Sequence, residues 1–174
     1  MNNVPWFGPG VLVSAAAALG VALPLGRALL VRPALAGFLV FSFGIVLSAT
    51  MTPLRDALEA GAIGTGVCDF SRLGIAPFAE LDGPTDTVLN ILLVVPLGMA
   101  VGLLPRSRRM AAMLVASMAL PLVIESIQLV APVLARGCQS ADVVDNLTGL
   151  FAGLALGAAL RLIVEGAKDR SHMS

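Results

Sequence analysis

Five long runs of apolar residues constrain this chain more than any other feature. They cover residues 11–31, 34–51, 87–104, 110–130 and 143–164. Each has about the 17–25 residues that an α-helix needs to cross the hydrocarbon layer of a bilayer. Lipid cannot pair exposed backbone amides, and these runs lack the alternating pattern of β-barrel strands. The sequence therefore predicts an all-α, polytopic membrane helical bundle of about five transmembrane helices, with residues 1–174 forming a single membrane domain.

Composition supports a membrane protein and argues against a protein that binds nucleic acid or a metal ion. Of the 174 residues, 57% are hydrophobic and 13% charged, whereas soluble domains are about 25% charged. The formal net charge is zero, so the chain offers no basic face to a nucleic acid. Two cysteines and one histidine, His172 in the C-terminal tail, are too few for a metal site of their own. We therefore expect no metal, no cofactor and no nucleic-acid partner.

The distribution of positive charge predicts how the helices are oriented. Eight of the 11 Lys and Arg residues fall on one side of a five-helix arrangement, and the positive-inside rule places that side in the cytoplasm. They are Arg27, Arg32, Arg106, Arg108, Arg109, Arg161, Lys168 and Arg170. We therefore expect a multi-pass protein of the cell membrane with its N-terminus outside, its C-terminus in the cytoplasm, and residues 52–86 as an extracytoplasmic loop. The apolar stretch LGIAPF at 73–78 of this loop either rests on the outer membrane face or forms a lip over a site.

Polar residues within the predicted helices share one depth in the membrane. Asn90 lies about one turn inside the third helix, Glu125 and Gln128 lie near the end of the fourth, and Asp142 and Asn146 lie near the start of the fifth. The third and fifth helices enter from outside and the fourth leaves to the outside, so all five residues fall in the outer third of the membrane. Intramembrane acids usually face the bundle or a wet cavity and mark a site. We therefore predict an outward-facing polar pocket, although Glu125 also fits a purely structural role as a protonated or arginine-paired acid.

Arg136, in the turn between the fourth and fifth helices, completes the predicted site. At the mouth of the pocket its guanidinium would pair with a phosphate or carboxylate, and Arg72 is a further candidate there. The predicted ligand-binding residues are Asn90, Glu125, Gln128, Arg136, Asp142 and Asn146.

Glycines predict where two helices pack closely. Gly149, Gly153 and Gly157 recur every four residues in the fifth helix, and Gly98 and Gly102 are four apart in the third. Small residues at this spacing let helix backbones approach each other in a membrane. We assign these residues to packing.

The two cysteines, Cys68 and Cys138, both fall in loops predicted to be outside. An even number of cysteines on the oxidising side is compatible with a disulfide. We favour a disulfide over two free thiols, and it would tie the long loop to the turn beside the predicted pocket.

Residues 73–160 carry four motifs that resemble, in combination, the VanZ-like family, named for a protein of the teicoplanin-resistance cluster. The motifs are IAPF at 75–78, Asp86 and Asn90 with Pro96 and Gly98, Glu125 with Gln128, and Arg136, Asp142, Asn146 and Gly149. Members often carry an acid three residues after the arginine, where this chain has Gln139. The resemblance implies a multi-pass bacterial membrane protein, in some members linked to lower susceptibility to lipoglycopeptides such as teicoplanin. It implies no settled biochemical activity.

Three functions fit these observations. The one we favour is a non-enzymatic cell-envelope protein whose pocket binds a membrane lipid headgroup, a lipid-linked wall precursor or the lipoglycopeptide. The second is a membrane enzyme that modifies such a lipid, with Glu125, Asp142 and Asp145 as candidates for general acid/base work or for holding a divalent cation. No hydroxyl has an evident activator, which weakens a nucleophilic mechanism. The third is a small transporter, but the inner halves of the helices show no polar relay.

Overall fold

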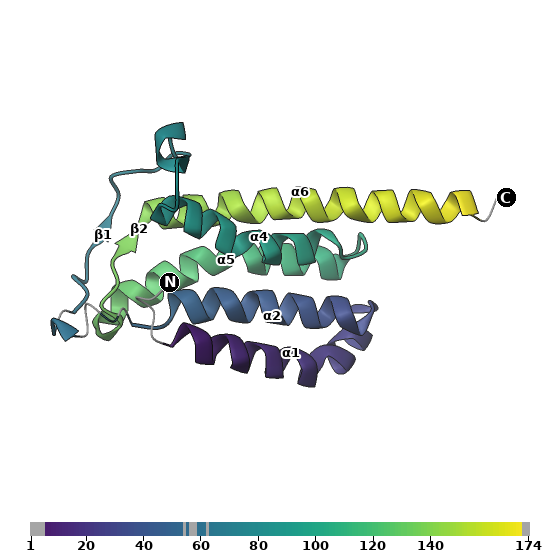
Figure 1. Ribbon diagram of the computed structural model, residues 1–174, viewed down its shortest axis with the longest axis horizontal. Coiled ribbons are helices and arrows are strands. Elements are labelled where there is room, and N and C mark those ends of the chain that lie inside the picture. Colours follow the sequence, from purple (N-terminus) through teal and green to yellow (C-terminus); the bar gives the residue numbers. More distant parts are fainter. Residues whose placement is uncertain (1–5, 54, 56–58, 62, 172–174) are drawn as a thin grey trace.

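The computed structural model of the protein is an elongated bundle in which five long helices run along one axis (Figure 1). It describes residues 6–53, 55, 59–61 and 63–171, so His172 lies outside the described residues. The long helices are α1 (Phe7–Leu29), α2 (Pro33–Thr50), α4 (Asp86–Gly102), α5 (Arg108–Val130) and α6 (Ser140–Ser171). Between them lie the short 3-10 helices η1 (Phe78–Leu81) and η2 (Pro132–Leu134) and the two-residue strands β1 (Cys68–Asp69) and β2 (Cys138–Gln139).

The helices confirm the predicted all-α membrane bundle. Four segments are long and apolar enough to cross a membrane, namely α1, α2, α5 and the Ser140–Lys168 part of α6, with mean hydropathies of 1.8 to 2.0. The fifth helix, α4, is apolar but has only 17 residues. At 1.5 Å per residue α4 is about 25 Å long, which is shorter than a typical hydrocarbon layer of about 30 Å.

The helix ends differ from the predicted spans for a physical reason. Hydropathy detects only the part of a helix that suits lipid, whereas α6 begins at Ser140 and continues to Ser171 through polar residues. Thr85 caps α4 by accepting a hydrogen bond from the Val88 amide at 3.3 Å, and Ser107 caps α5 in the same way. Such side chains satisfy backbone N–H groups that have no partner in the first helical turn. The cap at Thr85 places Asn90 one turn inside α4.

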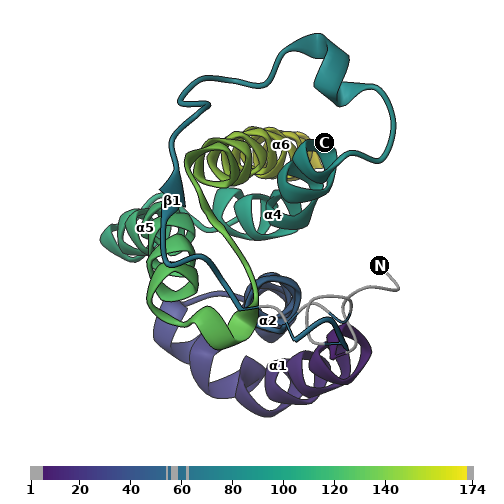
Figure 2. The ribbon, with the colours of Figure 1, turned by 90° about the vertical axis from the view of Figure 1, so that its left-hand side faces the viewer.

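Interlocking glycines join α4 to α6, which lie side by side in the end view of Figure 2. A methyl group added at any of five glycines would overlap backbone atoms of the other helix, so each position requires the absence of a side chain. On α6 these are Gly149, Gly153 and Gly157, which face the carbonyl oxygens of Ile91, Val95 and Met99; on α4 they are Gly98 and Gly102, which face those of Leu150 and Leu154. The predicted packing role of both glycine stripes is confirmed.

The apolar core lies where α2, α4, α5 and α6 meet. Its fully buried members include Val46, Val94, Val101, Ile124 and Leu150. Helix α1 packs chiefly against α2 and leaves many of its apolar side chains exposed. The core therefore positions the ends of α2, α4, α5 and α6 relative to one another.

One end of the bundle carries the irregular structure (Figure 1). There β1 and β2 pair in parallel, and Cys68 and Cys138 form a disulfide with their Cα atoms 4.5 Å apart. This confirms the predicted disulfide between the long loop and the α5–α6 turn. Residues 70–85, which we call the arm, then leave the bundle and return to α4, so that η1 lies beyond α6 and α4 in both views (Figures 1 and 2).

Candidate functional site

Polar side chains from three helices and the arm come together at the end of the bundle that carries the disulfide. Asn90 of α4 donates a hydrogen bond from Nδ2 to Oδ1 of Asp142 on α6, at 2.7 Å. Asp142 in turn interacts electrostatically with Glu125 of α5 and with Arg136 of the following turn. The predicted convergence of these residues is therefore present in the fold. We call the whole set the polar cluster: Arg72, Asn90, Glu125, Gln128, Arg136, Asp142, Asp145 and Asn146.

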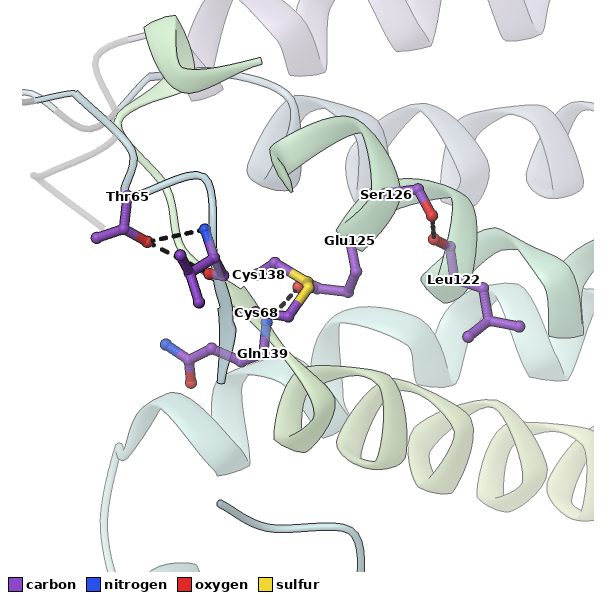
Figure 3. Close-up of a disulfide and its surroundings, with 8 residues drawn as sticks. Thr65, Cys68, Leu122, Glu125, Ser126, Cys138 and Gln139 are labelled. Atoms are coloured by element: carbon purple, nitrogen blue, oxygen red, sulfur yellow. Dashed lines mark hydrogen bonds between the residues drawn. A yellow bond between two sulfur atoms is a disulfide. The ribbon is translucent and has the colours of Figure 1, made fainter. Parts of the chain in front are cut away.

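Glu125 is buried and fixes the turn that leads into α6. Its Oε2 accepts a hydrogen bond from the backbone N–H of Gln139 in β2, at 2.7 Å. Figure 3 shows this bond beside the disulfide, with the side chain of Gln139 pointing away from Glu125. One carboxylate oxygen of Glu125 therefore has a structural partner.

Gln128 and Arg136 both bind the C-terminal end of α2. Gln128 Nε2 donates to the Thr50 carbonyl at 3.0 Å, while Arg136 donates from Nε to Thr52 at 2.8 Å and from Nη2 to Ala49 at 2.6 Å. The last carbonyls of a helix lack intrahelical donors and carry partial negative charge, which a guanidinium stabilises. Burial lowers the pKa of the Arg136 guanidinium from its ordinary value, and the nearby carboxylates oppose that shift. Arg136 therefore caps α2, and its role in binding a ligand stays a prediction.

Arg72 fixes the arm to α6. Its guanidinium meets Asp145 through two parallel contacts, Nη1 to Oδ1 at 3.0 Å and Nη2 to Oδ2 at 2.6 Å. The hydrogen bond to Asp145, whose side chain is almost fully buried, raises the pKa of Arg72. Glu80 lies 3.7 Å from Arg72 Nε and accepts a hydrogen bond from Thr87, while Ser140 donates to the Arg72 carbonyl. Sequence reasoning placed Arg72 near the site but missed this pairing, as well as Glu80 and Thr87.

Asn146 is the member of the polar cluster with an unmet hydrogen bond. Its side chain is 2% exposed, and Oδ1 has no hydrogen-bond partner within the described structure. It lies four residues after Asp142 and hence on the same face of α6. Buried polar atoms almost always have a partner, and one left without costs about 1–3 kcal/mol. Such an atom beside other polar groups indicates a place where a ligand or water donates.

Three hydroxyls near the carboxylates of the polar cluster donate to backbone carbonyls. Ser126 donates to the Leu122 carbonyl at 2.7 Å, on the side of α5 away from the disulfide (Figure 3), and Thr148 donates to Val144 at 2.8 Å. Ser140 donates to Arg72, as described above. None of these three hydroxyls donates to a carboxylate that would activate it. Thr87 does donate to a carboxylate, that of Glu80, at 3.2 Å. Among the residues that the structure describes, no group of three or more acids, cysteines and histidines is arranged to hold a metal ion.

Two apolar grooves lie elsewhere on the bundle. One, of about 530 Å³, runs between α1 and α2 and is lined by residues such as Ala18, Ala22 and Phe41. The other, of about 250 Å³, is bordered by α2, α4 and α5 and includes Phe43 and Met113. Neither groove contains a member of the polar cluster. The outward-facing pocket at the cluster stays a prediction.

A model of the VanZ/LLP1 family matches residues 34–161. The chain belongs to the VanZ/LLP1 family. The matched range begins in α2 and contains both cysteines, the arm and every member of the polar cluster of this VanZ/LLP1 protein, whereas α1 lies before it. No curated protein and no solved structure matches the chain.

Proposed function

We propose that this VanZ/LLP1 protein is a non-enzymatic binding protein of the cell envelope. Its polar cluster faces outward and binds a lipid headgroup, a lipid-linked wall precursor or a lipoglycopeptide, and its presence lowers susceptibility to teicoplanin-type antibiotics. The observation that carries the proposal is the convergence of buried polar groups from α4, α5 and α6, with Asn146 Oδ1 left without a partner.

The exposed apolar side chains of the arm favour a ligand that enters the polar cluster from the bilayer. Phe70, Leu73, Ile75 and Phe78 are all exposed, and Phe78 is 92% exposed. These side chains lie on a segment that projects sideways from the ends of α4 and α6 (Figures 1 and 2). Apolar side chains at the edge of a membrane bundle gain free energy by entering the bilayer interface. The arm then rests on the outer membrane face, with the polar cluster beside it at headgroup level.

The hydrogen bonds and ion pairs that already occupy the reactive side chains near the polar cluster favour binding over catalysis. Asp145 is neutralised by Arg72, and three hydroxyls near the cluster donate to backbone carbonyls. The Thr87 hydroxyl donates instead to Glu80, which lies outside the cluster. A membrane enzyme that used Glu125 and Asp142 as acid and base remains the alternative function. The two functions differ in their products, because only an enzyme changes the mass of its lipid ligand.

The proposal is tested by expressing the chain in a teicoplanin-susceptible bacterium. We expect growth at antibiotic concentrations that stop cells with an empty vector, and we expect Asn146→Ala to abolish that protection. Gln139→Ala is the matched control, because its exposed amide side chain points away from Glu125 (Figure 3). Immunoblots of the membrane fraction check that both variants accumulate to the same level.

Three results would contradict the proposal. If expression of the unaltered chain leaves antibiotic susceptibility unchanged, the protein has no resistance function. If the Asn146→Ala variant still protects fully, the polar cluster takes no part in resistance. If mass spectrometry of extracted lipids shows a new headgroup mass in expressing cells, the protein is an enzyme and not a binding protein.

A further inference from the structure

From the charge balance of the polar cluster we infer that it binds a primary ammonium group. This inference rests on the proposed binding function and specifies the chemistry of the ligand. Within the described residues, the polar cluster comprises three carboxylates and two guanidinium groups. The carboxylates are Glu125, Asp142 and Asp145, and the guanidinium groups are Arg72 and Arg136.

Both guanidinium groups already have close partners within the protein. Arg72 forms two parallel contacts with Asp145, and Arg136 donates to two carbonyls at the end of α2. The closest polar partner of Asp142 is instead the neutral amide of Asn90, at 2.7 Å. A carboxylate removed from water requires a counter-charge or must be neutralised. With its three carboxylates ionised the cluster carries one more negative charge than positive, and Asp142 is the carboxylate paired with neither a guanidinium nor a backbone N–H.

Asn146 adds an unpartnered acceptor one turn along the same face of α6. Its Oδ1 is buried and accepts no hydrogen bond in the described structure. A primary ammonium has three N–H donors and no acceptor, so one such group can donate to both Asp142 and Asn146 and also supply the missing positive charge. A phosphate brings only acceptors and negative charge to the same place. The geometry thus selects the amine end of a ligand.

Two sources of a primary amine at the outer face of the membrane are tested, the headgroup amine of an outer-leaflet lipid and the free amine of a lipoglycopeptide. The test measures dissociation constants for the full-length protein in detergent micelles by native mass spectrometry. The lipid probes are dioleoyl phosphatidylethanolamine and its N-acetyl derivative, in which the amine loses its charge. The antibiotic probes are teicoplanin and teicoplanin N-acetylated at its primary amine.

We expect at least one of the two amine probes to bind about tenfold more tightly than its acetylated partner, which corresponds to about 1.4 kcal/mol. The pair that shows the difference identifies the source of the amine. Asp142→Asn keeps an oxygen that accepts from Asn90 but removes the charge, so it abolishes the tenfold difference. Asp82→Asn, which removes an exposed carboxylate of the arm outside the cluster, retains the difference.

The outcomes separate this inference from the function on which it rests. Equal affinity for the amine and acetylated probes, with binding still lost in Asn146→Ala, overturns the ammonium ligand and leaves the binding function. Absence of binding by all four probes, or binding that Asn146→Ala does not change, overturns binding at the polar cluster itself.

Discussion

Replacing Gly153 by alanine tests the contact between α4 and α6 that brings Asn90 to Asp142. A methyl group at this position would lie 2.8 Å from the Met99 nitrogen and 2.9 Å from the Val95 carbonyl carbon, and it would overlap the Val95 oxygen. All three are backbone atoms, so no rotation of a side chain relieves the overlap. Ordinary contact begins near 3.4 Å. The nitrogen alone requires a local separation of about 0.6 Å, and the closer Val95 oxygen requires more, so the cost lies in the upper part, about 2–3 kcal/mol, of the range for overpacking.

The higher helix preference of alanine partly offsets the loss of stability caused by the overlap. Alanine is favoured over glycine within a helix by about 1 kcal/mol, which leaves a net loss of about 1–2 kcal/mol in the free energy of unfolding. For a chain of this size such a loss lowers the Tm by about 2–8 °C. Gly20→Ala in α1 is the matched control, because a methyl group there meets nothing within 4 Å. It gains the same helix preference without an overlap, so its Tm is expected to stay or rise.

The assay is thermal unfolding of the purified variants in one detergent, followed by far-UV circular dichroism. The two alanine variants differ in the sign of their expected effect, so a general response to the substitution cannot imitate the result. If Gly153→Ala matched or exceeded the Tm of the unaltered protein, the close backbone contact between α4 and α6 would be refuted.

Four further outcomes follow from the structure. The two cysteines are expected to resist thiol labelling until they are reduced, and two labelled thiols in a non-reduced sample would contradict the disulfide. Replacing both cysteines by serine is expected to lower the free energy of unfolding by about 4 kcal/mol, because the disulfide closes a loop of 70 residues in the unfolded chain. Arg72→Ala should destabilise by about 3 kcal/mol in thermal unfolding because it leaves Asp145 buried and unpaired, and adding Asp145→Asn should restore part of the loss; no recovery would argue against the pair. A tryptophan at Phe78, in a Trp6→Phe background, should be quenched by brominated lipids if the arm enters the interface, and water-like, unquenched emission would place the arm in solvent. A reporter fused after Ser107 should lie in the cytoplasm, and its appearance outside would reverse the topology.

Local patterns were sufficient to predict the helices, the glycine packing faces and the grouping of the polar residues at one end of the bundle. Apolar runs of spanning length admit little besides helices in lipid, and a four-residue glycine spacing marks one helix face without any knowledge of the partner. The depth argument needed only the alternating direction of successive helices. For this reason Asn90 and Asp142, 52 residues apart, were assigned to one site, and the structure joins them by a hydrogen bond.

The partners of the two arginines could not be predicted in the same way. An arginine near several acids fits a ligand phosphate, a carboxylate or the end of a helix equally well, and sequence spacing does not choose among them. Arg136 reaches the carbonyls of α2 more than 80 residues earlier in the chain, and Arg72 pairs with Asp145 across 73 residues. Both contacts depend on how α2 and the arm lie against α5 and α6, which is a property of tertiary packing. Their discovery shifts the expected ligand chemistry from an anion at Arg136 to a cation at Asp142.

A crystal structure grown from a lipid mesophase doped with phosphatidylethanolamine would show whether a ligand occupies the polar cluster. We expect an amine nitrogen about 2.7–3.2 Å from both the Asp142 carboxylate and Asn146 Oδ1, with the Arg72–Asp145 pair intact. Ligand binding at the polar cluster is contradicted if ordered lipid occupies only the apolar grooves, such as the one between α1 and α2, while Asn146 Oδ1 remains without a partner.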